Sequence, residues 1–314
     1  MRSVQWTIAV VLCLAPAISY GGTTAANSSP FAALDQPVAT ESPNPSTVNQ
    51  GALHFDLGAD YGNADFFRGI RQPVNSPAIQ GFVDVHFDIC KFGDLAVGSY
   101  FGYRNGGAEK SHNGAPLTDY LQEGFVGANL QYHAFSLDLG YIEHHSPDGT
   151  FASQDEVGAR LDYDDADLMK KCHIPLLLHP HVELFREVLD QSAVLSTRSE
   201  PAKQNSYLEI GIAPQHRFDI GSSGAWTVNV AMPVTAGMSW DNYYSLTPTA
   251  KPNFLGFVSV GAMASVPLPV PAKFGAWELR GGLTYVNDTA QGARQVDHNH
   301  ADFLTAGVGL EMHY

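Results

Sequence analysis

Apolar and polar residues alternate along most of this chain. In its last stretch, small or polar residues separate apolar side chains at every second position: Leu304, Ala306, Val308, Leu310, Met312 and Tyr314. A period of two is typical of a β-strand, because successive side chains point to opposite faces of the sheet. We therefore expect a terminal strand with one apolar face, one small or polar face, and an aromatic residue at its end.

The same period recurs from residue 51 onward and predicts about twelve strands, which lie at 53–61, 79–89, 94–104, 124–132, 135–144, 156–164, 176–187, 208–215, 226–234, 256–266, 277–286 and 304–314. Most have the roughly 9–11 residues that a tilted membrane strand needs. Pro180 and Pro233 lie inside predicted strands. Proline cannot donate to a strand ladder, so each should mark a bulge or a strand end.

Two further features favour a membrane barrel over a secreted β-sandwich, which also alternates. Short turns at 91–93, 133–134 and 218–225 separate longer loops at 62–78, 105–120, 188–206, 239–254 and 287–301, as in outer-membrane barrels. Aromatic residues also end the apolar faces, where they would form girdles at the lipid headgroups. These are Tyr61, Tyr103, Tyr132, Tyr141, Tyr163, Trp226, Trp277, Tyr285 and Tyr314.

The predicted fold class is therefore all-β, an antiparallel up-and-down transmembrane β-barrel of about twelve strands. Lipid offers no hydrogen-bond partners, so the last strand must pair with the first. An even strand count places both termini in the periplasm.

The N-terminal region indicates export. Arg2 precedes an apolar run at 8–18 and then small residues, which is the pattern of a signal peptide over 1–26. Residues 27–50 are rich in Ser, Thr, Pro and Ala, which predicts a disordered periplasmic lead-in before a barrel at 51–314. No later stretch is long and apolar enough for a membrane helix. The expected location is the cell outer membrane.

Charge and cysteine content narrow the function classes. The net charge of −15 disfavours a surface for nucleic-acid phosphates. Only Cys90 and Cys172 lie beyond the leader, which excludes a disulfide scaffold and a cysteine-rich metal module. The two thiols either form one bridge or are buried and free.

A family resemblance lies in the first predicted hairpin, which carries Asp60-Tyr61, then Phe67-Arg68-Gly69-Ile70-Arg71-Gln72, then Pro77-Ala78-Ile79-Gln80-Gly81. It resembles the Gcw_chp conserved-hypothetical group of Gram-negative outer-membrane proteins, whose members show S-D-Y-x-x-R-G-x-S-Q followed by P-A-x-Q-G. Here Ala59 replaces the leading serine, Arg71 replaces the later one, and residues are inserted after Tyr61. The resemblance covers roughly 57–103 and implies an exported barrel, without a settled activity.

The terminal strand separately resembles the C-terminal assembly signal of outer-membrane barrels. This likeness implies that the barrel-assembly machinery is a partner of the chain. The other partners that we expect are outer-membrane lipid and small solutes.

The predicted inner face of the barrel is acidic, and a wet pore lined by carboxylates attracts cations. A narrow lumen filled by Arg–Glu pairs is the alternative, and the sequence leaves the two open. The candidate lumen or constriction residues are Asp56, Asp60, Arg68, Arg71, Asp84, Glu123, Arg160, His179, His181, Glu183, Glu209 and Arg280.

The first long loop has two interpretations. Arg68 and Arg71 lie at the barrel mouth, where they could pair with Asp60, Asp65 or Asp84. Either the loop folds inward and constricts the pore, or it is an ordinary loop stabilised by surface ion pairs worth about 0–1 kcal/mol each. We favour the second interpretation, an ordinary loop with surface ion pairs.

Other chemistry is weakly indicated. His179, His181 and Glu183 share a strand face, but residues two apart on a strand are roughly 7 Å apart, too far for shared metal coordination. Ser136 and His144 share a face merely through alternation, and no Gly-x-Ser-x-Gly motif occurs. We expect no enzyme activity, cofactor or metal. The hypothesis is a narrow, cation-favouring passive channel, and the alternative is a structural or ligand-binding barrel, with loop aromatics such as Tyr243-Tyr244 exposed for a partner.

Overall fold

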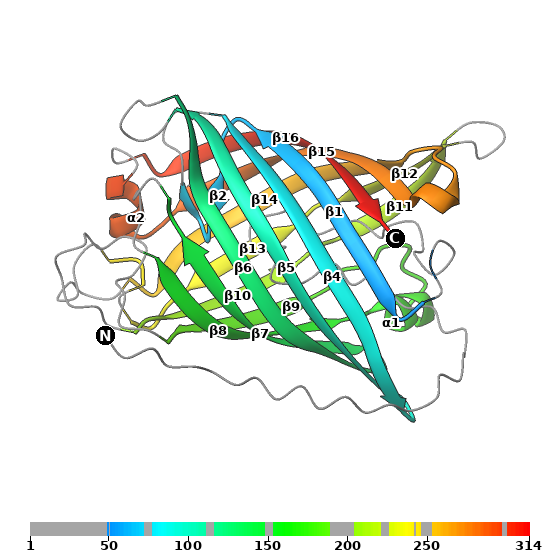
Figure 1. The fold of residues 1–314 in the computed structure, drawn as a ribbon. Helices are drawn as coiled ribbons and strands as arrows, with labels where there is room; N and C mark the ends of the chain where they lie inside the picture. Colours follow the sequence, from blue (N-terminus) through cyan, green and yellow to red (C-terminus); the bar gives the residue numbers. More distant parts are fainter. Residues whose placement is uncertain are drawn as a thin grey trace, which may run out of the picture.

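The chain folds into one closed β-barrel (Figure 1). The computed structural model describes residue 49 and residues 51–71, 77–110, 116–147, 153–188, 204–220, 226–241, 243–245, 253–296 and 300–314. The predicted signal peptide, nearly all of the predicted lead-in and most of the loop at 188–206 lie outside the described residues.

The barrel wall is antiparallel throughout. Its segments are β1 (Leu53–Gly62), β4 (Ala78–Phe92), β5 (Leu95–Lys110), β6 (Pro116–Tyr132), β7 (Phe135–His145), β8 (Gln154–Tyr163), β9 (His181–Glu187), β10 (Ser206–Ile212), β11 (Gln215–Ile220), β12 (Trp226–Ala231), β13 (Val234–Met238), β14 (Leu255–Pro267), β15 (Ala276–Asp288) and β16 (Asp302–His313).

Two of the barrel strands are interrupted. β10 pairs with β13, β11 pairs with β12, and both β12 and β13 pair with β14. β10 and β11 are thus two parts of one barrel strand, and β12 and β13 are two parts of another. The fourteen segments of the sheet therefore make the predicted twelve strands.

The prolines explain one of these breaks and one strand start. Pro233 lies between the end of β12 at Ala231 and the start of β13 at Val234, and Pro180 immediately precedes β9. A residue without an N–H leaves a gap in the ladder, so proline falls where regular pairing stops. Both predicted positions are confirmed.

Closure occurs between β16 and β1, as predicted. The register runs from Asp56 opposite His313 to Gly62 opposite Gly307. Beyond it, the Phe55 amide donates to the Tyr314 carbonyl over 2.7 Å, and the Tyr314 amide donates to the Phe55 carbonyl over 2.8 Å. Neither terminal strand therefore keeps an open edge.

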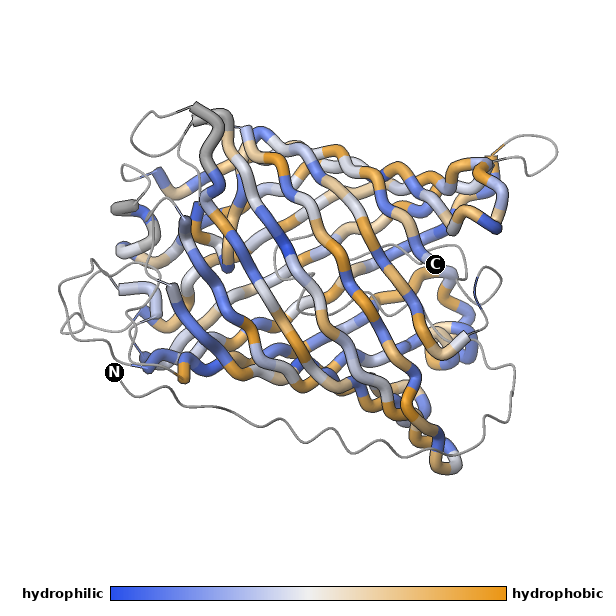
Figure 2. The backbone as a smooth tube through the Cα atoms, in the orientation of Figure 1, coloured by the Kyte–Doolittle hydropathy of each residue, from blue (hydrophilic) through white to orange (hydrophobic). Residues whose placement is uncertain are grey.

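The outside of the barrel is apolar and uncovered, and hydrophobic and hydrophilic positions alternate along each strand (Figure 2). Val126, in the middle of β6, is 53% exposed, and Val83, within β4, is 41% exposed. Exposed tyrosines lie at strand ends, as at Tyr61 in β1 and Tyr132 in β6, whereas Tyr103 lies in the middle of β5. An apolar band between aromatic girdles is typical of a lipid-facing barrel wall, whereas a sandwich would bury these side chains between its sheets. No helix within the described ranges is long and apolar enough to cross a membrane.

The two barrel ends differ. One end carries the C-terminus and the tight turns at Gly93 and His133, both with positive φ. It also carries α1 (Ala166–Lys171) and the 3₁₀ helix η2 (Ala272–Phe274), so the β8–β9 connection there is longer than a tight turn. The opposite end carries β2 (Phe66–Phe67), β3 (Ile70–Arg71) and α2 (Gln291–Val296). By the usual barrel topology, these ends face the periplasm and the exterior, respectively.

Arginine in place of Val126 should destabilise the barrel by about 2–4 kcal/mol, because the charge would face hydrocarbon at mid-strand. Arginine in place of Tyr132, on the same face at the end of β6, should cost only about 0–1 kcal/mol near the interface. Urea titrations of both variants in lipid vesicles measure this difference. Equal costs at the two positions would contradict a lipid-facing wall.

Candidate functional site

The first long loop turns into the barrel as a hairpin. β2 and β3 pair Phe66 with Arg71 and Phe67 with Ile70, which leaves Arg68 and Gly69 as a two-residue turn. Both turn residues have positive φ, 50° and 79°, as a type I′ turn requires. A Cβ at Gly69 would overlap the Phe257 ring, so glycine is also needed for the close packing against β14.

Arg68, at the tip of this hairpin, is completely buried and bound to the barrel wall. Its Nη1 donates to Glu156 Oε1 over 2.6 Å and to the Tyr243 hydroxyl over 2.8 Å. Its Nη2 donates to Glu156 Oε2, which completes a bidentate pair with β8. A guanidinium and a carboxylate match in this geometry, and such pairs are strong.

Aromatic rings surround the same guanidinium. Its carbon lies 4.5 Å from the ring centre of Phe185, 4.4 Å from that of Tyr207 and 4.8 Å from that of Phe67. Contacts of a cation with ring faces in a site without water are worth about 2 kcal/mol or more. We call Arg68, Glu156, Phe185, Tyr207 and Tyr243 the Arg68 clamp.

The Arg68 clamp shows that the favoured interpretation, an ordinary loop with surface ion pairs, is wrong. Arg68 does not pair with Asp60, Asp65 or Asp84, and its ion pair is not at the surface. Burial opposes the charge of Arg68, but the Glu156 carboxylate, together with Tyr243 and Tyr207, outweighs this effect and holds the arginine pKa well above its ordinary value.

A histidine extends the clamp to a second carboxylate. His144 Nε2 lies 3.6 Å from Glu156 Oε2, and its Nδ1 lies 3.0 Å from Glu123 Oε2. The Phe67 ring packs edge-on against His144 at a centroid distance of 4.7 Å. The predicted site residue Glu123 is therefore part of the surroundings of the hairpin.

The loop after β13 also enters the lumen. Tyr243 and Tyr244 are 0% and 1% exposed, so the expected exposed aromatic pair is wrong. The Tyr244 hydroxyl donates to the Arg68 carbonyl over 3.3 Å, and a Cβ at Gly292 in α2 would overlap the Tyr244 carbonyl. Three loops therefore pack together at the outer end, because aromatic rings gain more by covering the hairpin than by facing water.

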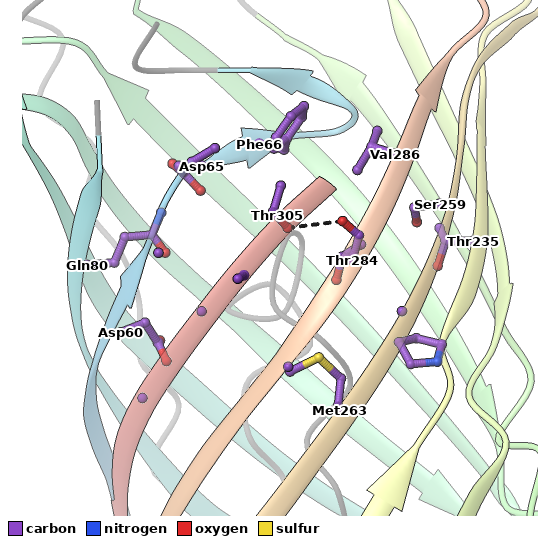
Figure 3. A pocket seen from close by; sticks show the side chains of 18 of the residues that line it. Asp60, Asp65, Phe66, Gln80, Thr235, Ser259, Met263, Thr284, Val286 and Thr305 are labelled. Carbon is purple, nitrogen blue, oxygen red and sulfur yellow. Dashed lines mark hydrogen bonds between the residues drawn. The ribbon is translucent and has the colours of Figure 1, made fainter. Parts of the chain in front are cut away.

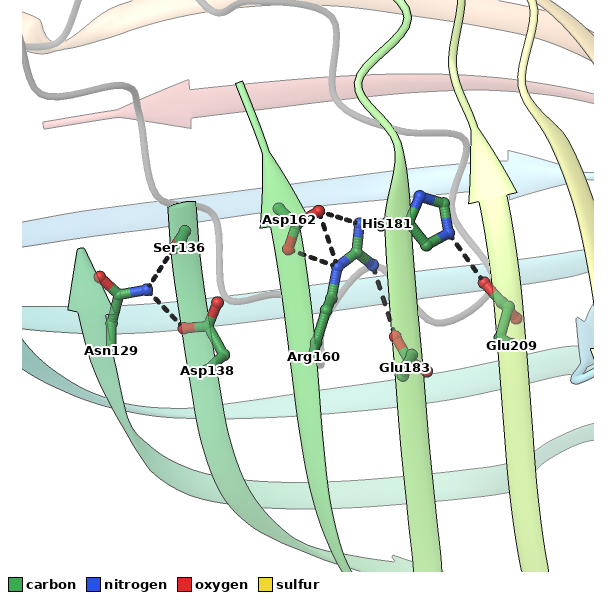
Figure 4. Close-up of polar contacts among 8 residues, drawn as sticks. All are labelled: Asn129, Ser136, Asp138, Arg160, Asp162, His181, Glu183 and Glu209. Carbon is green, nitrogen blue, oxygen red and sulfur yellow. Dashed lines mark hydrogen bonds and ion pairs between the residues drawn. The ribbon is translucent and has the colours of Figure 1, made fainter. Parts of the chain in front are cut away.

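Below the hairpin, ion pairs line the wall from β8 to β10 (Figure 4). Arg160 binds Asp162 through Nε at 2.9 Å and lies 3.5 Å from Glu183. His181 Nε2 lies 3.3 Å from Glu209 Oε1. These predicted residues alternate along neighbouring strands, so their side chains meet on the inner face.

On the opposite wall, the predicted residues Arg280 and Asp60 bind each other, and Arg280 also binds Glu311. Its Nη2 donates to Asp60 Oδ2 over 2.7 Å, and its Nη1 donates to Glu311 Oε2 over 2.7 Å. Asp56 accepts from His313 Nδ1 over 2.6 Å. Charged side chains of opposite sign are thus paired on this side of the inner surface also.

The remaining predicted residues, Asp84, Arg71 and His179, lie apart from one another and outside these ion pairs. Asp84 is fully buried, and neither of its carboxylate oxygens has a hydrogen-bond partner among the described residues. Arg71 lies 5.8 Å from the Phe303 ring centre, at the hairpin base. His179 precedes β9 with positive φ and contacts Gln215, away from Glu183.

Ser136 and His144 do not come together, and the two cysteines do not form a disulfide. Ser136 lies at the opposite end of β7 from His144, and its Oγ accepts a hydrogen bond from the Asn129 side chain. Cys90 and Cys172 are both free, and neither is fully buried. The expected absence of enzyme activity stays a prediction.

A cavity of about 180 Å³ remains inside the barrel beside the hairpin (Figure 3). Small side chains from β13 to β16 form one wall, among them Thr235, Ser259, Thr284 and Thr305. Polar groups elsewhere on its lining include Asp60, Asp65, Arg160, His181, Glu209 and Arg280. The space is large enough for several water molecules, and Phe66, Phe257 and Met263 complete its lining.

Asp65 gives this cavity a titratable group outside the barrel strands. The Tyr120 hydroxyl donates to Asp65 Oδ2 over 2.6 Å. Burial raises the pKa of the Asp65 carboxyl to about 6, despite this hydrogen bond.

Similar known proteins are found among solved structures. No family model matches the sequence, and no curated protein matches it. The resemblance of the first hairpin to the Gcw_chp group stays a prediction. Among solved structures, the β-domain of the Bordetella autotransporter BrkA is 11% identical, with coverage of 83% of this chain and 98% of that one and a TM-score of 0.41.

Two other solved structures are similar to the same degree. The NanC porin is 9% identical, with 82% of this chain and 98% of that one covered and a TM-score of 0.41. The outer-membrane phospholipase A from Escherichia coli is 11% identical, with 82% and 92% covered and a TM-score of 0.39. Similarity at this level carries no information about transport or catalysis.

Methionine in place of Arg68 should destabilise the protein by about 3–5 kcal/mol, because Glu156 would stay buried without the bidentate arginine. Glu156→Gln should cost a similar amount, and the double variant should cost less than the sum of the single ones. Urea unfolding in detergent measures all three free energies.

The control is Arg217→Met, since the Arg217 and Asp219 side chains are 67% and 64% exposed and their pair should be worth about 0–1 kcal/mol. Strict additivity of the Arg68 and Glu156 effects would contradict the bidentate pair.

Proposed function

We propose that this protein is an outer-membrane β-barrel that acts as a narrow, cation-favouring passive channel for small solutes. The observation that carries the proposal is the cavity beside the inward hairpin. Small residues line it on the β13–β16 side, while rings and ion pairs fill the β8–β10 side. The hairpin is thus a constriction that leaves a water-sized space along one wall.

The buried charges support a preference for cations. The inner surface holds more acids than arginines, and an acidic passage raises the local concentration of cations. The buried arginines are Arg68, Arg104, Arg160 and Arg280. The buried acids of the strands are Asp56, Asp84, Glu123, Asp138, Glu156, Glu183, Glu187, Glu209, Glu278, Asp288 and Glu311.

A structural or ligand-binding barrel without transport is the second candidate. The Arg68 clamp favours it, because a buried bidentate pair within an aromatic surround holds the hairpin firmly in the lumen. A barrel of twelve strands also has little space left once side chains project inward. In this case the cavity would hold bound water or a small polar ligand.

Planar-bilayer recordings distinguish the two candidates. The wild-type protein should show a small conductance, and its reversal potential in a KCl gradient should have the sign of cation selectivity. Arg68→Met should raise the conductance, because the hairpin loses its anchor to β8. Arg217→Met, which makes the same chemical change on an exposed pair, should leave it unchanged.

A variant with residues 64–71 replaced by a Gly-Ser linker extends this test. It should conduct several-fold more than the wild type. Absence of conductance in both proteins would reject the channel and leave the structural barrel, and anion selectivity would reject the electrostatic argument.

The cation preference should also depend on pH. Since the pKa of Asp65 is raised to about 6, its carboxyl is mostly ionised at pH 7 and mostly protonated at pH 5. Acidification through this range removes a negative charge from the cavity lining and should reduce cation selectivity. Reversal potentials at pH 5 and pH 7 measure this change, and Asp65→Asn should largely abolish it. An equal change in the variant would assign the effect to other groups.

A further inference from the structure

Two carboxylates face each other inside the barrel near its periplasmic end. Glu278 on β15 lies directly opposite Glu311 on β16, and both are 1% exposed. His313, two positions along β16 and therefore on the same face, is also 1% exposed. Like charges directly opposite on neighbouring strands destabilise a sheet, so this arrangement favours a cation between the two carboxylates.

The ligand atoms of these three residues converge. One carboxylate oxygen from each glutamate and one ring nitrogen of His313 all lie within 4.8 Å of one another. Glu278 Oε2 and His313 Nε2 are buried and have no hydrogen-bond partner in the part of the chain that the structure describes. An unsatisfied buried polar atom costs about 1–3 kcal/mol, and two residues of this cluster each have one.

The remaining atoms of the cluster are engaged and oriented. His313 Nδ1 contacts Asp56 Oδ1 at 2.6 Å, and Glu311 Oε2 accepts from Arg280. The Ser265 hydroxyl donates to Glu278. The other oxygen of Glu311, Oε1, lies 3.7 Å from His313 Nε2, so these two atoms could bind the same ion.

We propose that Glu278, Glu311 and His313 bind one divalent transition-metal ion of the zinc class. One imidazole nitrogen and carboxylate oxygens suit such an ion, and the deprotonated Nε2 is available when Nδ1–H donates to Asp56. Asp56 is then a positioning residue, since a carboxylate behind a ligating histidine fixes its ring and its tautomer. Arg280 binds Glu311 Oε2 and neutralises part of the charge of this carboxylate, so Oε1 is the oxygen left to bind the metal.

The position of this site indicates a structural role. Its ligands join β15 and β16, and Asp56 lies across the closing pair on β1. A bound ion would therefore hold together the three strands at which the barrel closes. The proposal does not depend on transport, because the cluster lies in the wall and does not include the hairpin.

Zinc binding to the folded barrel tests the proposal. The protein is treated with a chelator in detergent, the chelator is removed, and Zn²⁺ alone is titrated in a calorimeter. We expect one site per chain, which Glu278→Gln and His313→Gln abolish. Asp56→Asn should weaken binding by about 10–100-fold. His133→Gln is the matched control, since this side chain is 60% exposed at a turn, and it should leave the site unchanged.

Two measurements on the wild-type protein need no variant. X-ray absorption of the zinc-loaded barrel should show one imidazole nitrogen with carboxylate oxygens at about 2.0–2.2 Å. Zinc should also raise the urea midpoint, because the ion binds the folded state. No stoichiometric binding, binding that survives Glu278→Gln, or two or more imidazole ligands would each overturn the assignment.

Discussion

The hydrocarbon of a bilayer neither donates nor accepts hydrogen bonds, so each strand within it must be paired on both sides. Here the requirement is met by the pairing of β16 with β1, which leaves no open edge. In a closed barrel whose strands alternate with a period of two, apolar side chains face outward to the lipid and polar side chains face inward to the lumen. The inner surface is polar because of this geometry, and its chemistry follows from how that polarity is satisfied.

A charge in a narrow lumen is costly unless a partner of opposite sign lies beside it. The wall meets this condition with pairs between neighbouring strands, such as Arg280 with Glu311. The hairpin meets it with Arg68, whose partner Glu156 comes from the wall. The same interaction thus both neutralises the lumen and holds a loop within it. Where a buried oxygen of Glu278 and a ring nitrogen of His313 have no hydrogen-bond partner among the described residues, the proposed metal ion would satisfy them.

The strands and the closing pair could be predicted because alternation is a local signal that lipid makes strict. The two interior prolines were equally informative, since each removes one N–H at a known position. The partner of Arg68 could not be predicted, because Glu156 is 88 residues away and meets it only when the loop turns inward. The Arg68-Gly69 pair between Phe67 and Ile70 was a hairpin signal, but it does not say which way the hairpin points.

The seam between β1 and β16 also has a kinetic consequence. The Asp56–His313 contact spans 257 residues, whereas most other neighbouring strands follow each other in the chain. The entropy of loop closure grows with the logarithm of the intervening length, and distant contacts slow folding. Successive hairpins can therefore form early, and the seam forms last. Until then the two outermost strands present unpaired amides and carbonyls, which are templates for association between chains.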